Sequence, residues 1–233
     1  MGQPEMAPRG EATQRHSNAI RAARQPNFAR SERAMLCDLF NAVGPDRPTL
    51  CAGWTTRDLA AHLLVRDRRP DAAAGAVVKP LAGHTENVRR AVAAGAYETV
   101  VDGVRHPPLL SLAGVPAIDR LVNTAEFFIH HEDVRRGLPG WAPRDLPRGL
   151  EATLHSQVRL ANRFRVRRFP ASLTILSPGY PVVTAGAGGP ALTISGTPGE
   201  LTMFFSGRQR AANVTVDGPD DLVERLRTAQ LGI

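Results

Sequence analysis

One carboxylate and two imidazoles in this chain have the types and spacing to share a metal ion. Glu126 and His130 lie four residues apart within 123–137, so on a helix they project from one face, a turn apart. His62 follows Leu59 by three residues, which places it on the apolar stripe of another helix. We therefore predict a site in which His62, Glu126 and His130 hold a divalent cation between two helices.

Each of the three residues also has an ordinary structural explanation. A histidine on an apolar stripe is usually hydrogen-bonded in the core, and Glu126 could face solvent. The combination favours a metal, because a divalent cation satisfies a buried carboxylate and two imidazoles together. Two histidines and one glutamate with a free fourth position form a catalytic zinc set, in which a bound water or thiol ionises more readily.

Neighbouring polar residues have predicted roles around this site. Asp133, three residues after His130, could orient that imidazole. Asp58 could do the same for the other histidine, although it also completes a helix capping box with Thr55. His131 lies about 100° around the helix from its neighbour and is expected to point away.

The other histidines and the two cysteines carry weaker signals. His84 stands at a helix start and His106 beside a proline turn, so both are expected at the surface, with a substrate-side position as the alternative. Cys37 lies on an apolar stripe and is expected to pack, and Cys51 is not a first choice as ligand or nucleophile. A fourth protein ligand such as His84 or Cys51 would close the metal site against substrate.

The hydrophobic pattern predicts a mainly α-helical N-terminal part that would hold the site. Apolar residues recur at helical spacing, with capping residues and prolines marking the ends. The predicted helices cover 31–43, 55–69, a segment capped by Thr85, 97–104 and 116–137. Four-helix bundles often hold metals with side chains from facing helices.

The pattern changes in the C-terminal part. A Pro- and Gly-rich segment at 137–149 predicts a linker, and a helix follows from Leu150. Short apolar runs between turns then predict strands at 173–176, 182–184, 192–195 and 214–216, with helices opening at Thr197 and Pro219. The predicted organisation is a disordered extension (1–29), a metal-binding helical bundle (30–147), and a linking helix with a small α+β domain (148–233).

Composition limits the classes of partner. The net charge is +7, but Lys79 is the only lysine and the arginines are spread along the chain. Aromatic residues make up only 5%, which disfavours a nucleic-acid surface because such surfaces need clustered charge and stacking rings. No apolar run is long enough to span a membrane and no signal segment opens the chain. We expect a cytoplasmic monomer or homodimer.

The sequence resembles a known family in two motifs. They are W-x3-D-L-x2-H-L over residues 54–63 and E-x3-H over 126–130. These resemble the DinB-like metal-binding bundles, and more narrowly the actinobacterial branch related to mycothiol-dependent maleylpyruvate isomerase. The likeness covers about residues 31–137, and the C-terminal unit resembles the smaller domain of those isomerases. The resemblance implies zinc or a similar divalent ion held by His62, Glu126 and His130.

The resemblance also implies a reaction. Mycothiol would be the low-molecular-weight thiol, and its sulfur could take the open metal position before adding to a small electrophilic substrate. The chain would then be an S-transferase or a thiol-dependent isomerase. Those isomerases use an arginine of the C-terminal domain, for which Arg208 is the first expectation as an anchor for an anionic group. Segments 66–75 and 80–88 match nothing in the isomerase, which indicates a sibling subfamily. The alternative is a metal-binding sensor or regulatory module without turnover.

Overall fold

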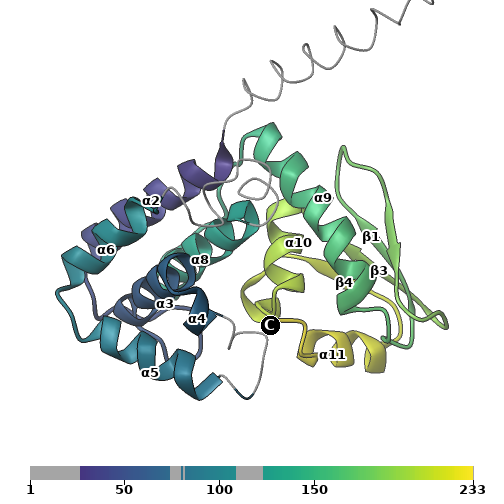
Figure 1. The fold of residues 1–233 in the computed structure, drawn as a ribbon. Helices are drawn as coiled ribbons and strands as arrows, with labels where there is room; N and C mark the ends of the chain where they lie inside the picture. The colour runs from purple at the N-terminus through teal and green to yellow at the C-terminus, as the bar shows by residue number, and fades with distance from the viewer. Residues whose placement is uncertain (1–26, 74–79, 81, 109–122, 233) are drawn as a thin grey trace, which may run out of the picture.

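The protein is mainly helical with one small sheet. The structure is a computed structural model that describes residues 27–73, 80, 82–108 and 123–232. Figure 1 shows the helices of the N-terminal half on one side and the sheet with its helices on the other. None of the helices in the described ranges combines the length and the apolar character that a membrane crossing needs.

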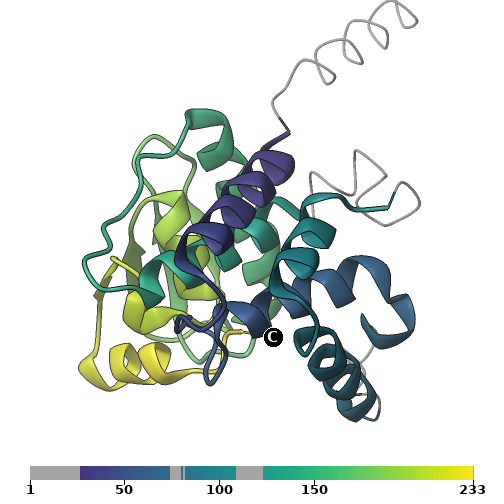
Figure 2. The same cartoon turned by 90° about the vertical axis from the view of Figure 1, so that its left-hand side faces the viewer.

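The N-terminal helices surround a continuous apolar core. They are α2 (Phe28–Val43), α3 (Thr56–Arg68), α4 (Pro70–Ala73), α5 (Ala82–Ala93), α6 (Tyr97–Arg105) and α8 (Thr124–Gly137). α2 packs against α8 and α6, while α4 and α5 lie against α3. In Figure 2, α2 is the purple helix that crosses the middle of the view. The core is built from residues at helical spacing, among them Leu36, Phe40, Leu59, Leu63, Val101 and Phe127.

Two of the predicted helix starts are wrong. α2 begins at Phe28 rather than residue 31, because the Asn27 side chain caps it by accepting from the backbone N–H of Arg30 at 3.1 Å. α5 begins at Ala82, and Thr85 does not cap it; the Thr85 hydroxyl instead donates to the Ala72 carbonyl. The predicted disordered extension at 1–29 is therefore wrong at its end, because Asn27 caps α2 and residues 28–29 belong to the helix. Residues 1–26 and the predicted helix start at Pro116 lie outside the described residues.

The C-terminal sheet follows the predicted strands to within one residue. Its order is β2 (Val183–Ala185), β1 (Ser172–Leu176), β3 (Ala191–Ser195) and β4 (Thr215–Asp217). β1 and β3 run parallel, and the outer strands pair antiparallel. The remaining elements are α9 (Arg148–Arg165), α10 (Pro198–Phe205), η5 (Gln209–Ala211) and α11 (Asp220–Thr228). Residues from α9, α10 and α11 share one core with the strands.

A buried ion network ties the N-terminal helices to the C-terminal part. The Arg136 guanidinium of α8 donates to both carboxylate oxygens of Glu200 on α10, at 2.9 and 2.7 Å, and to Glu132 at 2.7 Å. The Trp141 ring covers Arg136, with the guanidinium carbon 4.6 Å from the ring centre. Because this paired fork leaves little freedom of angle, it fixes how α10 sits against α8.

The segment between α8 and α9, predicted as a linker, is held by the same network. Arg144 donates to Glu132 at 2.7 Å and to Glu32 of α2 at 3.0 Å. The Phe28 ring of α2 packs directly on Gly149 in the first turn of α9. A Cβ atom at residue 149 would lie only 2.7 Å from this ring, so the contact requires glycine. Ion pairs and apolar contacts thus attach this segment at both ends to the N-terminal helices.

We expect Arg136→Leu to destabilise the protein strongly. It leaves the buried Glu200 carboxylate without its cation, an effect that typically costs roughly 3–5 kcal/mol of the free energy of unfolding. Arg105→Leu removes the same charge from a pair whose partner Asp38 is exposed, and is expected to cost less than about 1 kcal/mol. Urea denaturation followed by circular dichroism measures both, and equal midpoint shifts would contradict the assigned role of Arg136.

Candidate metal centre

Helices α3 and α8 bring His62, Glu126 and His130 together. One donor atom from each lies within 4.8 Å of the other two. The Glu126 Oε1 atom is 3.3 Å from His130 Nε2 and 3.8 Å from His62 Nε2. The two imidazole rings meet edge to face, with centres 5.4 Å apart. The spacing of four residues on α8 thus produces the shared face that the sequence predicted.

The separations of these donor atoms fit a bound divalent ion. Two ligands at about 2.0–2.1 Å from a tetrahedral zinc lie about 3.3–3.4 Å apart. The nitrogen–oxygen separations at Glu126 are 3.3 and 3.8 Å, so small side-chain movements bring all three atoms to binding distance. The donor set of two imidazole nitrogens and one carboxylate oxygen suits zinc and similar divalent metals.

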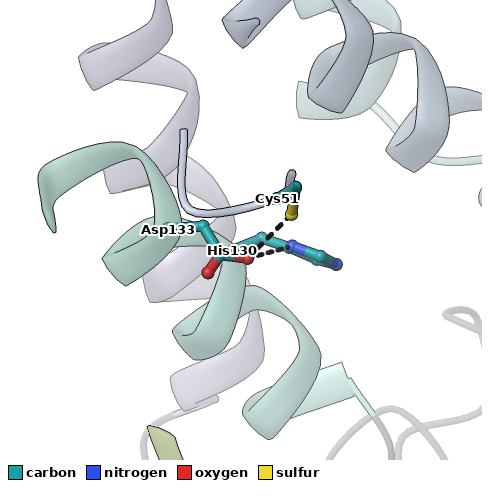
Figure 3. A group of neighbouring side chains, drawn as sticks. All are labelled: Cys51, His130 and Asp133. Atoms are coloured by element: carbon teal, nitrogen blue, oxygen red, sulfur yellow. Dashed lines mark hydrogen bonds and ion pairs between the residues drawn. The ribbon is translucent and has the colours of Figure 1, made fainter. Parts of the chain in front are cut away.

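Asp133 controls which nitrogen of His130 is available. The carboxylate is fully buried, and His130 Nδ1 donates to Asp133 Oδ2 at 2.9 Å. With its proton held on Nδ1, a neutral imidazole presents an unshared electron pair at Nε2, which is the atom that faces Glu126. Figure 3 shows the Nδ1 edge turned toward Asp133 and the other ring nitrogen turned away. This is the orienting contact predicted from the sequence.

Arg208 holds Asp133 in place. Its Nε and Nη2 atoms donate to the two carboxylate oxygens at 2.8 and 2.6 Å, and Nη1 donates to the Ser206 carbonyl at 2.6 Å. The sequence analysis expected Arg208 to anchor an anionic group of a substrate. The structure places it beside the centre, where its donors contact Asp133, the Ser206 carbonyl and the Cys51 sulfur. It thereby positions the carboxylate that orients His130, and its contact with a substrate anion stays a prediction.

The charges at the centre are strongly coupled. Burial alone would lower the pKa of His130, but Asp133 and Glu126 raise it well above its ordinary value. Burial opposes ionisation of Glu126, yet the two histidines lower its pKa well below the usual range. Burial lowers the pKa of His62. In the metal-free protein a proton on His130 therefore balances two carboxylates, and a metal ion must displace that proton to bind.

Other polar residues named from the sequence do not join the trio. Asp58 completes the capping box with Thr55 and pairs with Arg89 at 2.6 Å, so the capping explanation is correct. His131 is buried and contacts Glu32 at 2.8 Å, away from the centre as expected. The exposed residues His84 and His106 pair with Asp71 and Asp102. Cys37 packs in the core, where burial raises the pKa of its thiol to about 11.

Sequence reasoning missed one residue near the centre and considered another only as a possible fourth ligand. Arg66 stands one turn after His62 on α3, and its Nε lies 3.3 Å from Glu126 Oε1; the spacing of four from His62 was the available signal. Cys51 Sγ lies 3.2 Å from Asp133 Oδ2, beside the Nδ1 edge of His130. Nothing in the sequence pairs this loop cysteine with α8. Because Cys51 borders the opposite edge of the ring, it does not complete the trio.

Comparison with known proteins shows the fold. No protein-family model matches the chain, and no curated protein matches it. Two solved structures match over 84% of this chain and 95% of theirs. They are mycothiol-dependent maleylpyruvate isomerase (TM-score 0.56, 16% identity) and a histidine-to-alanine mutant of such an isomerase (TM-score 0.58, 14% identity). The resemblance read from residues 54–63 and 126–130 is therefore confirmed at the level of the fold.

We expect His62→Ala, Glu126→Ala and His130→Ala each to lose the bound metal, since two remaining ligands hold a divalent ion weakly. His131→Ala should retain it, because this neighbour contacts Glu32 instead. The exposed His84 gives a second control, His84→Ala, that leaves the core untouched. Elemental analysis of untagged protein measures metal per chain, and a full equivalent in His130→Ala contradicts the assignment.

We expect Asp133→Asn to weaken metal affinity about 10–100-fold, because the orienting carboxylate of a metal-binding histidine is lost. Glu32→Gln is the matched control, since Glu32 makes the same kind of contact with His131 on the same helix. Competition with a chromophoric zinc chelator measures both affinities. Equal affinities in the two variants would show that Asp133 does not act through His130.

Proposed function

We propose that this protein binds one divalent metal ion, zinc in the first instance, through His62, Glu126 and His130, and activates a low-molecular-weight thiol against a small electrophilic substrate. The observation that carries the proposal is the convergence of three donor atoms from α3 and α8 within 4.8 Å. The fold supports it, because both matching structures are of a mycothiol-dependent isomerase.

The centre has the properties that activation of a thiol requires. A divalent ion with three protein ligands keeps a fourth position and favours the ionised form of a thiol bound there. The chain supplies the rest of the arrangement: Asp133 keeps a proton on His130 Nδ1, and Arg208 holds Asp133. Arg66 adds a positive charge beside Glu126, with its Nε 3.3 Å from Oε1, which would favour an anionic sulfur on the metal.

The surroundings of the trio favour an open site over the non-catalytic alternative. In the part of the chain that the structure describes, the trio gains no fourth histidine, cysteine or carboxylate ligand. Cys51 contacts Asp133 at the other edge of His130, and His84 pairs with Asp71 at the surface. A closed sensor or regulatory site would need a fourth ligand, because structural sites are fully coordinated by protein.

The fold supports a choice of thiol and reaction class. Mycothiol is the thiol we propose, and an S-transfer or a thiol-dependent isomerisation is the proposed reaction, because an ionised thiol adds to activated double bonds or strained rings. We place the protein in the cytoplasm, where low-molecular-weight thiols are kept reduced.

We expect cobalt-substituted protein to develop a thiolate-to-cobalt absorption band when mycothiol is added. The band reports a sulfur ligand at the fourth position. Cys51→Ala is expected to keep the band, which shows that the sulfur comes from the added thiol, and His62→Ala is expected to lose it with the metal. A cobalt-loaded protein whose spectrum ignores the thiol would support the closed, non-catalytic reading.

A further inference from the structure

A groove lined by arginines lies where α9 ends beside α11. Its volume is about 350 Å³. Three arginines from separate segments face it: Arg165 at the end of α9, Arg168 in the following loop, and Arg225 on α11. Apolar wall is supplied by Phe169 and Leu231, and no aspartate or glutamate is among the lining residues. The groove therefore combines concentrated positive charge with an apolar side.

None of the three arginines forms an ion pair within the described part of the chain. Buried arginines elsewhere in the protein are paired, as Arg136 is with Glu200 and Arg208 with Asp133. Arg165 is half-buried, yet Nη1 donates only to the neutral Phe205 carbonyl at 2.8 Å and the Ser206 hydroxyl at 3.4 Å. A partly desolvated cation is costly without a counter-charge, so the groove is electrostatically incomplete without an anion.

The surroundings of Arg165 reinforce this conclusion. Burial and the nearby Arg208 lower the pKa of the Arg165 guanidinium, and together they outweigh the opposing effect of the Glu126 carboxylate. The cation thus lies in a setting that disfavours its charge, and a bound anion would relieve both effects. Arg225 is partly oriented in advance, because its guanidinium carbon lies 5.9 Å from the centre of the Phe169 ring.

A chain of contacts through Ser206 links the groove to the candidate metal centre. Arg165 contacts the hydroxyl of Ser206, and Arg208 contacts the carbonyl of the same residue. Arg208 in turn holds Asp133, which orients His130. An anionic group bound at Arg165 would therefore lie next to Ser206, the residue that Arg165 and Arg208 share.

We propose that this groove is an anion-binding site for the phosphate or carboxylate group of a small molecule. A guanidinium presents a planar fork of donors that matches the oxygens of either group. The volume lies at the lower end of the roughly 300–1,000 Å³ seen for small-molecule pockets, and the apolar wall can cover the rest of a small ligand. The site requires no metal, so anion binding can be measured independently of the proposed thiol chemistry.

The test is isothermal titration of the metal-free full-length protein in a low-salt buffer without oxyanions. Inorganic phosphate, pyrophosphate and tricarballylate serve as probes. We expect saturable binding of one anion per chain for at least one of them. Preference for pyrophosphate assigns the site to phosphorylated ligands, and preference for tricarballylate assigns it to carboxylates.

Two double variants separate a built site from general positive charge. Arg168→Gln/Arg225→Gln removes two exposed groove arginines and is expected to weaken binding at least tenfold. Arg167→Gln/Arg227→Gln removes the same charge from the same two segments, at positions that do not line the groove, and is expected to change binding less than threefold. Equal losses in the two variants, or no saturable binding of any probe to the parent protein, would overturn the proposal.

Discussion

The candidate centre depends on how the charge of Asp133 is balanced. This carboxylate has no exposed surface. It accepts a hydrogen bond from His130 on its own helix and further hydrogen bonds from the Arg208 guanidinium of the C-terminal part. These contacts lower the pKa of Asp133 to about 2 despite its burial, so it remains ionised. Because Arg208 is distant in sequence from Asp133, the orientation of His130 depends on how the C-terminal part packs against α8. The pairing of Arg136 with Glu200 holds that packing in place.

Local patterns were sufficient to predict much of the fold and the three proposed ligands. Glu126 and His130 share a face because of helical periodicity, and the apolar stripe of α3 turns His62 inward. The strands follow from alternation and turn residues, which are local as well. The start of α2 was missed because its capping residue, Asn27, precedes the apolar repeat. Thr85 was predicted to cap a helix, but its hydroxyl donates to the Ala72 carbonyl of a neighbouring helix instead. The start near Pro116 is untested.

The arginines show where local reasoning stops. The arginines are spread along the chain, and their positions in the sequence do not reveal their partners. In the fold Arg136, Arg144 and Arg208 neutralise buried carboxylates, whereas the groove arginines gather without any among the described residues. The difference is set by contacts between segments far apart in the chain. It could not be read from spacing, so the sequence did not reveal that Arg208 contacts Asp133.

Charge at the trio also bears on what would occupy the fourth metal position. A divalent ion held by two neutral imidazoles and the Glu126 carboxylate retains one positive charge. The Arg66 guanidinium adds a second positive charge, with its Nε 3.3 Å from Glu126 Oε1. The trio is half-buried to buried, so water screens these charges less than at an open surface. Such a position favours an anionic ligand over neutral water, and an ionised thiol meets that condition. Arg66, outside the residues that carry the family resemblance, therefore strengthens the case for a thiol on the metal.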